Sequence, residues 1–219
     1  MAQINKTLMT IAIAAFCGSA AVTGLALTAA RPAAQPEAGV AADHPLAHVM
    51  NIDPAKSEAA WMAASMPGTA HAWLGQFIGT WSTKTSMDMG NGPMVSEGTA
   101  EFSWLVEGRF LLQEFNGDMM GMPLQGYGVQ GFDNLKRQYV GTWLDSMSTG
   151  ITMTQGSLDQ TGKIMTLVGG MDEPTTGEMN KPVAFVTTVI DDDHMRFEAK
   201  ELIHGEPFTV FTIDYQRID

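Results

Sequence analysis

The chain has 219 residues, of which 45% are hydrophobic and only 16% are charged, and its formal net charge is -12. This composition is typical of a globular protein and excludes a disordered or fibrous one. A nucleic-acid partner is excluded, because phosphate recognition requires a basic surface, and anionic membrane surfaces are disfavoured for the same reason.

Residues 1–30 predict an export signal that is not part of the fold. One charged residue, Lys6, precedes an apolar run from Leu8 to Ala30, and Arg31 ends the run. A short positive region, an apolar stretch and small residues at its end are typical of a signal peptide. The run is also long enough to stay uncleaved as a membrane anchor. Both interpretations predict a periplasmic or extracellular protein, either released or anchored by residues 8–30.

The single cysteine, Cys17, lies inside this apolar run. Phe16 precedes it, whereas a lipidated cysteine would follow a small residue, so we expect no lipidation. Once residues 1–30 are removed, the mature chain has no disulfide, no thiolate nucleophile and no cysteine metal ligand. The fold must therefore be held together by its core alone.

Three further regions follow the signal. Residues 31–53 are rich in Ala and Pro and predict a linker. Residues 54–78 predict short helices, because Asp53-Pro54 suits a helix start and Pro67-Gly68 suits its end. A second short helix is expected from Thr69 to Ile78. Residues 79–219 form the predicted main domain.

The main domain reads as a series of short strands separated by turns about every ten residues. The run 94–106 alternates cleanly, with Met94, Ala100, Phe102, Trp104 and Val106 on one face, as a half-buried strand requires. No helix separates the strands, so parallel βαβ units are excluded. Closure into an up-and-down antiparallel barrel would remove exposed strand edges, and a sandwich is the alternative. We expect about ten strands: 81–89, 94–106, 109–118, 124–132, 138–145, 150–158, 163–171, 181–190, 194–203 and 207–217.

Four stretches resemble a known family. They are residues 74–81 (LGQFIGTW), 107–111 (EGRFL), 131–150 (GFDNLKRQYVGTWLDSMSTG) and 213–217 (IDYQR). They resemble the bacterial domain-of-unknown-function 1579 family, and the similarity extends over residues 54–219. The resemblance implies an all-β, calycin- or lipocalin-like barrel, often on exported proteins. It implies no activity.

Motifs for cofactors are weak. Gly126, Gly128 and Gly131 match G-x-G-x-x-G, but a dinucleotide site needs a helix after that loop, and here another strand follows. Curvature of a tightly packed barrel strand explains these glycines better. The five histidines suit neither a haem ligand inside the barrel nor a catalytic triad. We therefore predict no cofactor and no metal site.

Methionine is unusually abundant, with 17 residues, and it clusters at 87–94 and 119–122. Thioethers can bind Cu(I), which makes copper binding a minor alternative function. Methionine also fills irregular cores and lines adaptable pockets, and we prefer these explanations.

A ligand pocket is predicted at one end of the barrel. On strand 138–145, alternation puts Tyr139, Trp143 and Asp145 on one face. A carboxylate beside an indole is costly to bury alone, and Arg109 is the cation we expect to pair with it. A buried structural ion pair, or an Asp145 that caps the following turn, would explain the pattern without a ligand. The predicted ligand-binding residues are Arg109, Tyr127, Trp143, Asp145, Thr149 and Tyr215, and no catalytic residue is predicted.

These features favour an exported binding module for a small apolar or amphipathic ligand. Two alternatives stay open: an uncharacterised enzyme that uses the same cavity, and a structural protein with a filled barrel. No catalytic motif supports the enzyme. Strand 163–171 is apolar on both faces, so we expect the N-terminal helices or a second subunit of a homodimer to cover its outer face.

Overall fold

The computed structural model describes residues 43, 45, 47–50, 52–88, 92–119, 121–202 and 207–218. The predicted signal or anchor, residues 1–30, lies outside the described residues, together with most of the predicted linker. The chain divides into two compact units, Met1–Ile52 and Asp53–Asp219, and the first contains helix α2 (Ala47–Met50). Within the described residues, no helix combines the length and apolarity that a membrane span requires.

The second unit begins with the predicted helices. Helix α3 (Pro54–Ser65) starts where Asp53 accepts a hydrogen bond from the Ala55 backbone N–H at 2.9 Å, as an N-cap residue does. Helix α4 (Thr69–Leu74) continues directly into the 3₁₀ helix η1 (Gly75–Phe77). None of the side chains of α3 is buried, whereas α4 and η1 bury Leu74 and Phe77.

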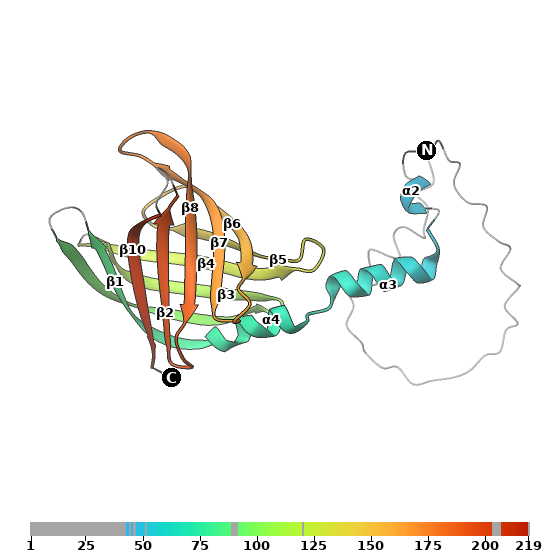
Figure 1. Ribbon diagram of the computed structural model, residues 1–219, viewed down its shortest axis with the longest axis horizontal. Helices are drawn as coiled ribbons and strands as arrows, with labels where there is room; N and C mark the ends of the chain where they lie inside the picture. Colours follow the sequence, from blue (N-terminus) through green and yellow to red (C-terminus); the bar gives the residue numbers. More distant parts are fainter. Residues whose placement is uncertain are drawn as a thin grey trace, which may run out of the picture. The chain divides into compact units, whose positions relative to one another are not determined.

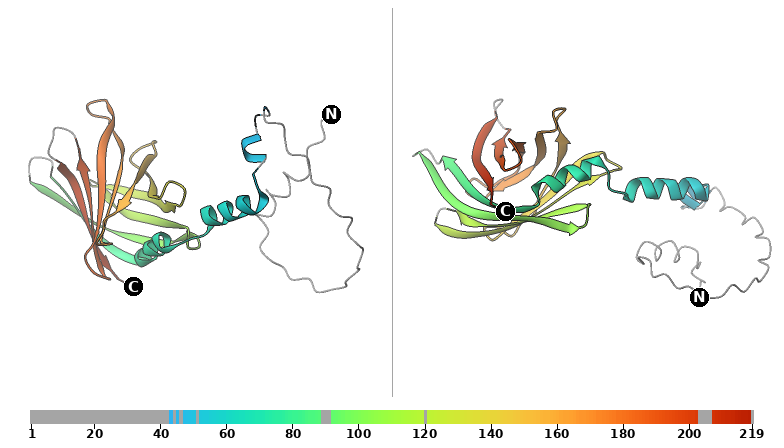
Figure 2. Two further views of the ribbon diagram at one scale, coloured as in Figure 1. Left: turned by 45° about the vertical axis from the view of Figure 1, so that its right-hand side comes forward. Right: turned by 90° about the horizontal axis from the view of Figure 1, so that it is seen from below.

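Ten antiparallel strands then close into a barrel (Figures 1 and 2). Each strand pairs with the next along the chain, and β1 pairs with β10, which confirms the up-and-down barrel and excludes the sandwich. The strands are β1 (Gly79–Asp88), β2 (Pro93–Val106), β3 (Phe110–Met119), β4 (Met122–Asp133), β5 (Gln138–Asp145), β6 (Thr152–Leu158), β7 (Ile164–Glu173), β8 (Glu178–Val189), β9 (His194–Glu201) and β10 (Phe208–Arg217).

The alternation expected on β2 is present, with one exception. Ala100 and Phe102 are buried and face the barrel interior, as predicted. Val106 is 46% exposed because the pairing of β2 with β3 shifts register between Trp104 and Val106. One extra residue in a strand turns every later side chain to the other face.

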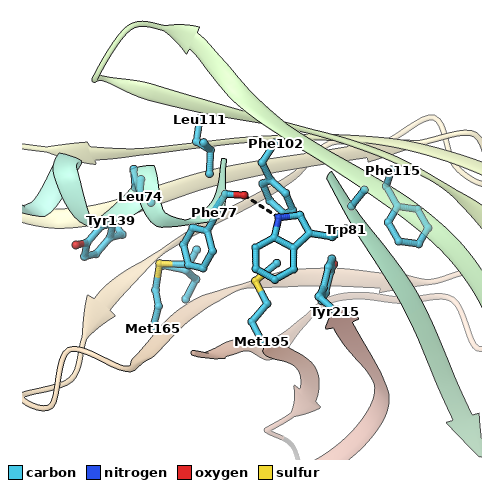
Figure 3. Close-up of a cluster of buried hydrophobic side chains, with 12 residues drawn as sticks. Leu74, Phe77, Trp81, Phe102, Leu111, Phe115, Tyr139, Met165, Met195 and Tyr215 are labelled. Carbon is cyan, nitrogen blue, oxygen red and sulfur yellow. Dashed lines mark hydrogen bonds between the residues drawn. The ribbon is translucent and has the colours of Figure 1, made fainter. Parts of the chain in front are cut away.

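One end of the barrel is filled by a continuous hydrophobic core. Leu74 and Phe77 enter it from α4 and η1, and Figure 3 shows Phe77 beside Trp81. The Trp81 indole N–H donates to the Phe77 carbonyl at 2.8 Å, so the largest buried side chain is also hydrogen-bonded. Burial of these aromatic and aliphatic groups is the main force that closes this end. The strand residues of this core are Trp81, Ala100, Phe102, Leu111, Phe115, Tyr139, Met165, Leu167, Met195 and Tyr215.

Helices α4 and η1 form what we call the helical plug. Polar contacts hold this plug against the barrel at the closed end. The Trp73 indole N–H donates to the Gly162 carbonyl at 2.8 Å, and the Tyr139 hydroxyl donates to the Ala70 carbonyl at 3.0 Å. The Arg217 guanidinium donates to the carbonyls of Gln76 and Ile78, each at 2.7 Å. The end of the last strand therefore holds the start of the first one, which closes the ring of strands.

Three apolar or aromatic strand residues lie outside the buried core. Phe110 is 40% exposed, and Tyr127 and Val210 are only half-buried on the outer face. The register explains this: the residues of β3 that face inward are Leu111, Gln113 and Phe115, so their immediate neighbours face out.

The outer face of β7 is exposed where its apolar residues lie. Ile164 is 38% exposed and Val168 is 42% exposed. Their alternation partners Met165 and Leu167 are buried inside the barrel. The apolar character of both faces of this strand is thus real, and its outer face is left open to solvent in the described unit.

Candidate ligand-binding cup

The barrel interior changes character along its axis. Many inward side chains at the closed end are at most 6% exposed, among them Trp81, Leu111, Met165 and Met195. Towards the opposite end several inward side chains are partly exposed, whereas others, such as Phe115 and Val183, stay buried. Solvent reaches part of the surface of the partly exposed side chains at this end, which we call the open end. We call the part of the interior that they line the cup; its apolar residues are Leu124, Trp143, Phe185, Phe197, Phe211 and Ile213.

Aromatic rings dominate the cup wall. The ring of Phe197 lies 6.1 Å from that of Phe185 and 5.9 Å from that of Phe211. On the opposite side the ring of Trp143 meets that of Phe115 edge-on, with centroids 6.2 Å apart. Rigid aromatic surfaces that are not fully covered by the protein are typical of small-molecule sites.

The glycine motif on β4 shapes this wall. A Cβ at Gly126 would lie 2.3 Å from the Trp143 ring, and one at Gly128 would lie 3.3 Å from it. Both glycines therefore provide a flat surface on which the indole rests inside the cup. The sequence prediction that these glycines serve strand packing instead of a nucleotide is consistent with this geometry.

Asp145 lies on the same inward face as Trp143. The Trp143 indole N–H donates to Asp145 Oδ2 at 2.7 Å, and the Met147 backbone N–H donates to Asp145 Oδ1 at 2.9 Å. The carboxylate therefore fixes the orientation of the indole and caps the turn after β5. Its two oxygens are both occupied by protein donors.

A second inward charged group is the ion pair between Lys181 on β8 and Glu201 on β9, with an N–O distance of 3.0 Å. Both side chains face the barrel interior, because Glu201 pairs directly with the buried, inward residue Val183, and Lys181 lies two residues before Val183 on the same strand. The hydrogen bond to Glu201 raises the pKa of Lys181. Sequence reasoning missed this pair, although Lys181 alternates in phase with Val183 and Phe185.

A group of uncharged polar side chains lies deeper in the barrel. Gln113 on β3 donates its amide N–H to the Tyr215 hydroxyl at 3.2 Å. Burial raises the pKa of Tyr215 to about 12, so this hydroxyl stays protonated at neutral pH. Thr83 pairs in register with Tyr215 and is 4% exposed, and its hydroxyl has no hydrogen-bond partner. We call Thr83, Gln113 and Tyr215 the polar floor.

The structure brings together three of the six predicted site residues. Trp143, Asp145 and Tyr215 face the interior. Tyr127 lies on the outer face, where it lines a groove of about 280 Å³ with Glu114. Thr149 is exposed in the turn between β5 and β6.

The expected ion pair between Arg109 and Asp145 does not form. Arg109 lies in the turn before β3, and its guanidinium donates to the Glu107 carbonyl at 3.4 Å. Asp145 ends β5 and pairs with Gly126, which in turn pairs with Phe115, five residues along β3 from Phe110. Five residues of strand span about 17 Å, so the two groups lie at opposite ends of the barrel.

The described methionines of both clusters lie at the rim of the cup. Met87 pairs with Met94 at the tip of the β1–β2 hairpin, and Met119 pairs with Met122 at the tip of the β3–β4 hairpin. Met94 is 40% exposed and Met122 is 47% exposed. Flexible, polarisable side chains at a rim suit an adaptable entrance. Among the described residues, no group of three or more His, Cys, Asp or Glu side chains is placed to hold a metal ion.

A family model described as "Protein of unknown function (DUF1579)" matches residues 66–217. The chain belongs to the DUF1579 family. The match confirms the resemblance noted in the sequence, although it begins at Met66, so that α3 precedes it. No curated protein matches the chain in sequence.

Two solved structures resemble this DUF1579 chain. Rv2717c from M. tuberculosis is 14% identical with a TM-score of 0.51, and the similarity covers 70% of this chain and all of that one. An S-type phycobiliprotein lyase from Guillardia theta is 11% identical with a TM-score of 0.48, over 73% of this chain and 97% of that one. At 14% identity the likeness to Rv2717c shows the barrel fold and nothing finer.

Proposed function

We propose that this DUF1579 protein is an exported binding protein that holds a small apolar or amphipathic molecule in the cup. The observation that carries the proposal is the partly exposed aromatic wall formed by residues such as Trp143, Phe185 and Phe197. Partly exposed inward aromatics leave apolar area that a ligand can remove from water, at about 25 cal/mol per Å². The methionine rim gives such a ligand an adaptable entrance.

The closed end supports a container in preference to a channel. Leu74 and Phe77 fill that end, and hydrogen bonds from Trp73 and Tyr139 fasten the helical plug. A ligand would therefore enter and leave by the open end. Small molecules are typically held in concave apolar sites with a few placed polar groups, and the cup has this make-up.

An enzyme in the same cavity is less well supported. Among the residues that the structure describes, the ionisable groups inside the cup are Asp145, Lys181 and Glu201, and each already has protein partners. A general acid or base needs a titrating group that can reach the substrate. We therefore keep binding as the proposed function.

Two neighbouring residues on β6 provide a matched test. Thr152 pairs with Trp143 and faces the cup, whereas Met153 faces outward and is 71% exposed. Thr152→Trp should fill the cup, while Met153→Trp adds the same indole outside. With the neutral solvatochromic dye Nile red as probe, we expect Thr152→Trp to weaken binding by about tenfold or more, equivalent to about 1.4 kcal/mol. Equal affinities for both variants and the wild type would refute binding inside the barrel.

Export is the second part of the proposal, and it rests on the apolar run Leu8–Ala30. N-terminal sequencing of the protein from its own host, after separation of soluble and membrane fractions, distinguishes cleavage from anchoring. A soluble cytosolic protein that begins at Met1 would contradict export in either form.

A further inference from the structure

The polar floor indicates which ligand head group the cup accepts. The argument rests on the proposed function, because it concerns the ligand of the same cup. Gln113 is half-buried and faces the interior, so solvent reaches it. Tyr215 is 6% exposed and lies behind it, where its hydroxyl fixes one amide N–H of Gln113.

Gln113 keeps hydrogen-bonding groups that a ligand can use. An amide has two N–H donors and an acceptor oxygen, and within the described residues the bond to Tyr215 is the one this side chain makes. The amide thus keeps one donor and one acceptor. A hydroxyl, carbonyl or amide group of a ligand can use both.

Thr83 adds a second indication. Its hydroxyl is buried, faces the interior and has no partner, and such a group costs about 1–3 kcal/mol. Thr83 is the register partner of Tyr215, and a guest polar group that reaches its hydroxyl would remove this cost. The floor is therefore incomplete in the ligand-free barrel.

The charges inside the barrel exclude an anionic head. In the described part of the barrel, the cationic side chains that face inward are Lys181, which is bound by Glu201, and Arg217, which is bound by backbone carbonyls at the closed end. Asp145 and Glu201 add negative charge to the walls, and the whole chain carries -12. A carboxylate buried without a free cation loses its hydration with no compensation.

We propose that the cup binds an uncharged amphipathic molecule whose hydroxyl, carbonyl or amide head contacts Gln113 and Thr83 while its apolar chain lies along the aromatic wall towards the open end. Gln113 is the contact residue for the head, and Tyr215 is a positioning residue. An alkanol is the simplest molecule of this class.

A head-group series tests the proposal. 1-Octanol, octanoate, octylammonium and 1-chlorooctane share one chain, and each is titrated at pH 8 against bound Nile red. At this pH octanoate is ionised, because carboxyl pKa values lie near 4–5. We expect 1-octanol to bind about tenfold or more tighter than octanoate, a difference of about 1.4 kcal/mol. Octanoate or octylammonium binding as tightly as 1-octanol would overturn the inference.

Substitutions in the polar floor test where the head group of the ligand binds. Gln113→Met keeps the length of the side chain and removes the amide, so 1-octanol should bind about three- to tenfold more weakly, as expected for one lost hydrogen bond. The affinity for 1-chlorooctane should not change, because its head makes no such bond. Tyr127→Phe removes a hydroxyl from the outer face and serves as the control, with both affinities unchanged. An equal loss for 1-octanol and 1-chlorooctane in Gln113→Met would overturn the assigned contact.

Thr83→Val separates a ligand contact from a structural role. Because the Thr83 hydroxyl is unpaired, the variant should unfold at the same or a higher urea concentration than the wild type, while its affinity for 1-octanol falls. Lower stability with unchanged 1-octanol affinity would overturn the role of Thr83. Failure of Nile red and of every octyl compound to bind would overturn the proposed function as well, whereas Nile red binding with no head-group preference would overturn this inference alone.

Discussion

Removal of the Arg217 guanidinium should lower the stability of the barrel more than the loss of any other charged side chain. Arg217 donates to the carbonyls of Gln76 and Ile78, each at 2.7 Å, and its guanidinium carbon lies 4.1 Å from the centre of the Trp81 ring. Its side chain is 21% exposed and also forms a 3.5 Å ion pair with the more exposed Asp193. Arg217→Met keeps an apolar stem over Trp81 and removes every one of these polar contacts.

The expected magnitude follows from these contacts. Hydrogen bonds from charged groups contribute about 1.5–3 kcal/mol each, and the lower figure applies here because the guanidinium is partly exposed. A cation–π contact adds about 0.5–1 kcal/mol at such a site. An exposed ion pair such as that with Asp193 adds about 0.5 kcal/mol. Because water can partly replace the lost donors, we expect a net loss of about 2–4 kcal/mol in the free energy of unfolding.

Urea unfolding at pH 7, followed by circular dichroism, measures this loss, with Arg196→Met as the control. Arg196 forms a shorter ion pair with Asp214, at 2.6 Å, but the two side chains are 50% and 47% exposed. We expect that control to cost under about 1 kcal/mol, as exposed pairs do. If Arg196→Met costs as much as Arg217→Met, or if Arg217→Met costs under about 1 kcal/mol, the reasoning from burial fails.

Three further predictions concern other parts of the second unit. Asn134 donates to three carbonyls at the end of α3, between 2.9 and 3.3 Å, so Asn134→Ala should speed hydrogen exchange in α3 and leave the barrel strands unchanged. The hydrogen bond with Asp191 raises the pKa of His194 above 6.5. The resulting stabilisation of the fold is complete below pH 6.5 and is lost as the pH rises through the pKa of the folded state. NMR titration should show that Asp191→Asn lowers this pKa. A Cβ at Gly156 would lie 1.9 Å from a backbone oxygen, whereas one at Gly150 meets nothing, so Gly156→Ala should lower the melting temperature strongly and Gly150→Ala should not.

The fold could be predicted from the sequence because each strand has a local sequence pattern of its own. Alternation on 94–106 identified β2, and the absence of intervening helices identified the antiparallel meander. The error at Val106 came from a register irregularity, which depends on the pairing with β3 and has no signal within β2. The outward face of Phe110 is hard to predict for a related reason, since it depends on where β3 begins to pair.

The site was predictable within one strand and much less so between strands. Alternation placed Trp143 and Asp145 on one inward face, and their hydrogen bond follows from that spacing. The pairing of Asp145 with Arg109 failed because the ends of successive antiparallel strands alternate between the two ends of a barrel. The ion pair of Lys181 with Glu201 requires the β8–β9 register, which the sequence does not specify. The unpaired hydroxyl of Thr83 is a property of packing and has no sequence signal at all.

The central claim is that the cup is the binding site, and the indole resonance of Trp143 tests it most directly. Trp143 faces the cup, whereas Trp61 on α3 is 68% exposed and lies away from the interior face of any strand. NMR titration with 1-octanol, with the two indole N–H peaks assigned by Trp143→Phe and Trp61→Phe, compares the two sites in one sample. We predict a saturable shift of the Trp143 peak and an unchanged Trp61 peak. An unchanged Trp143 peak at concentrations of 1-octanol that displace Nile red would contradict the claim.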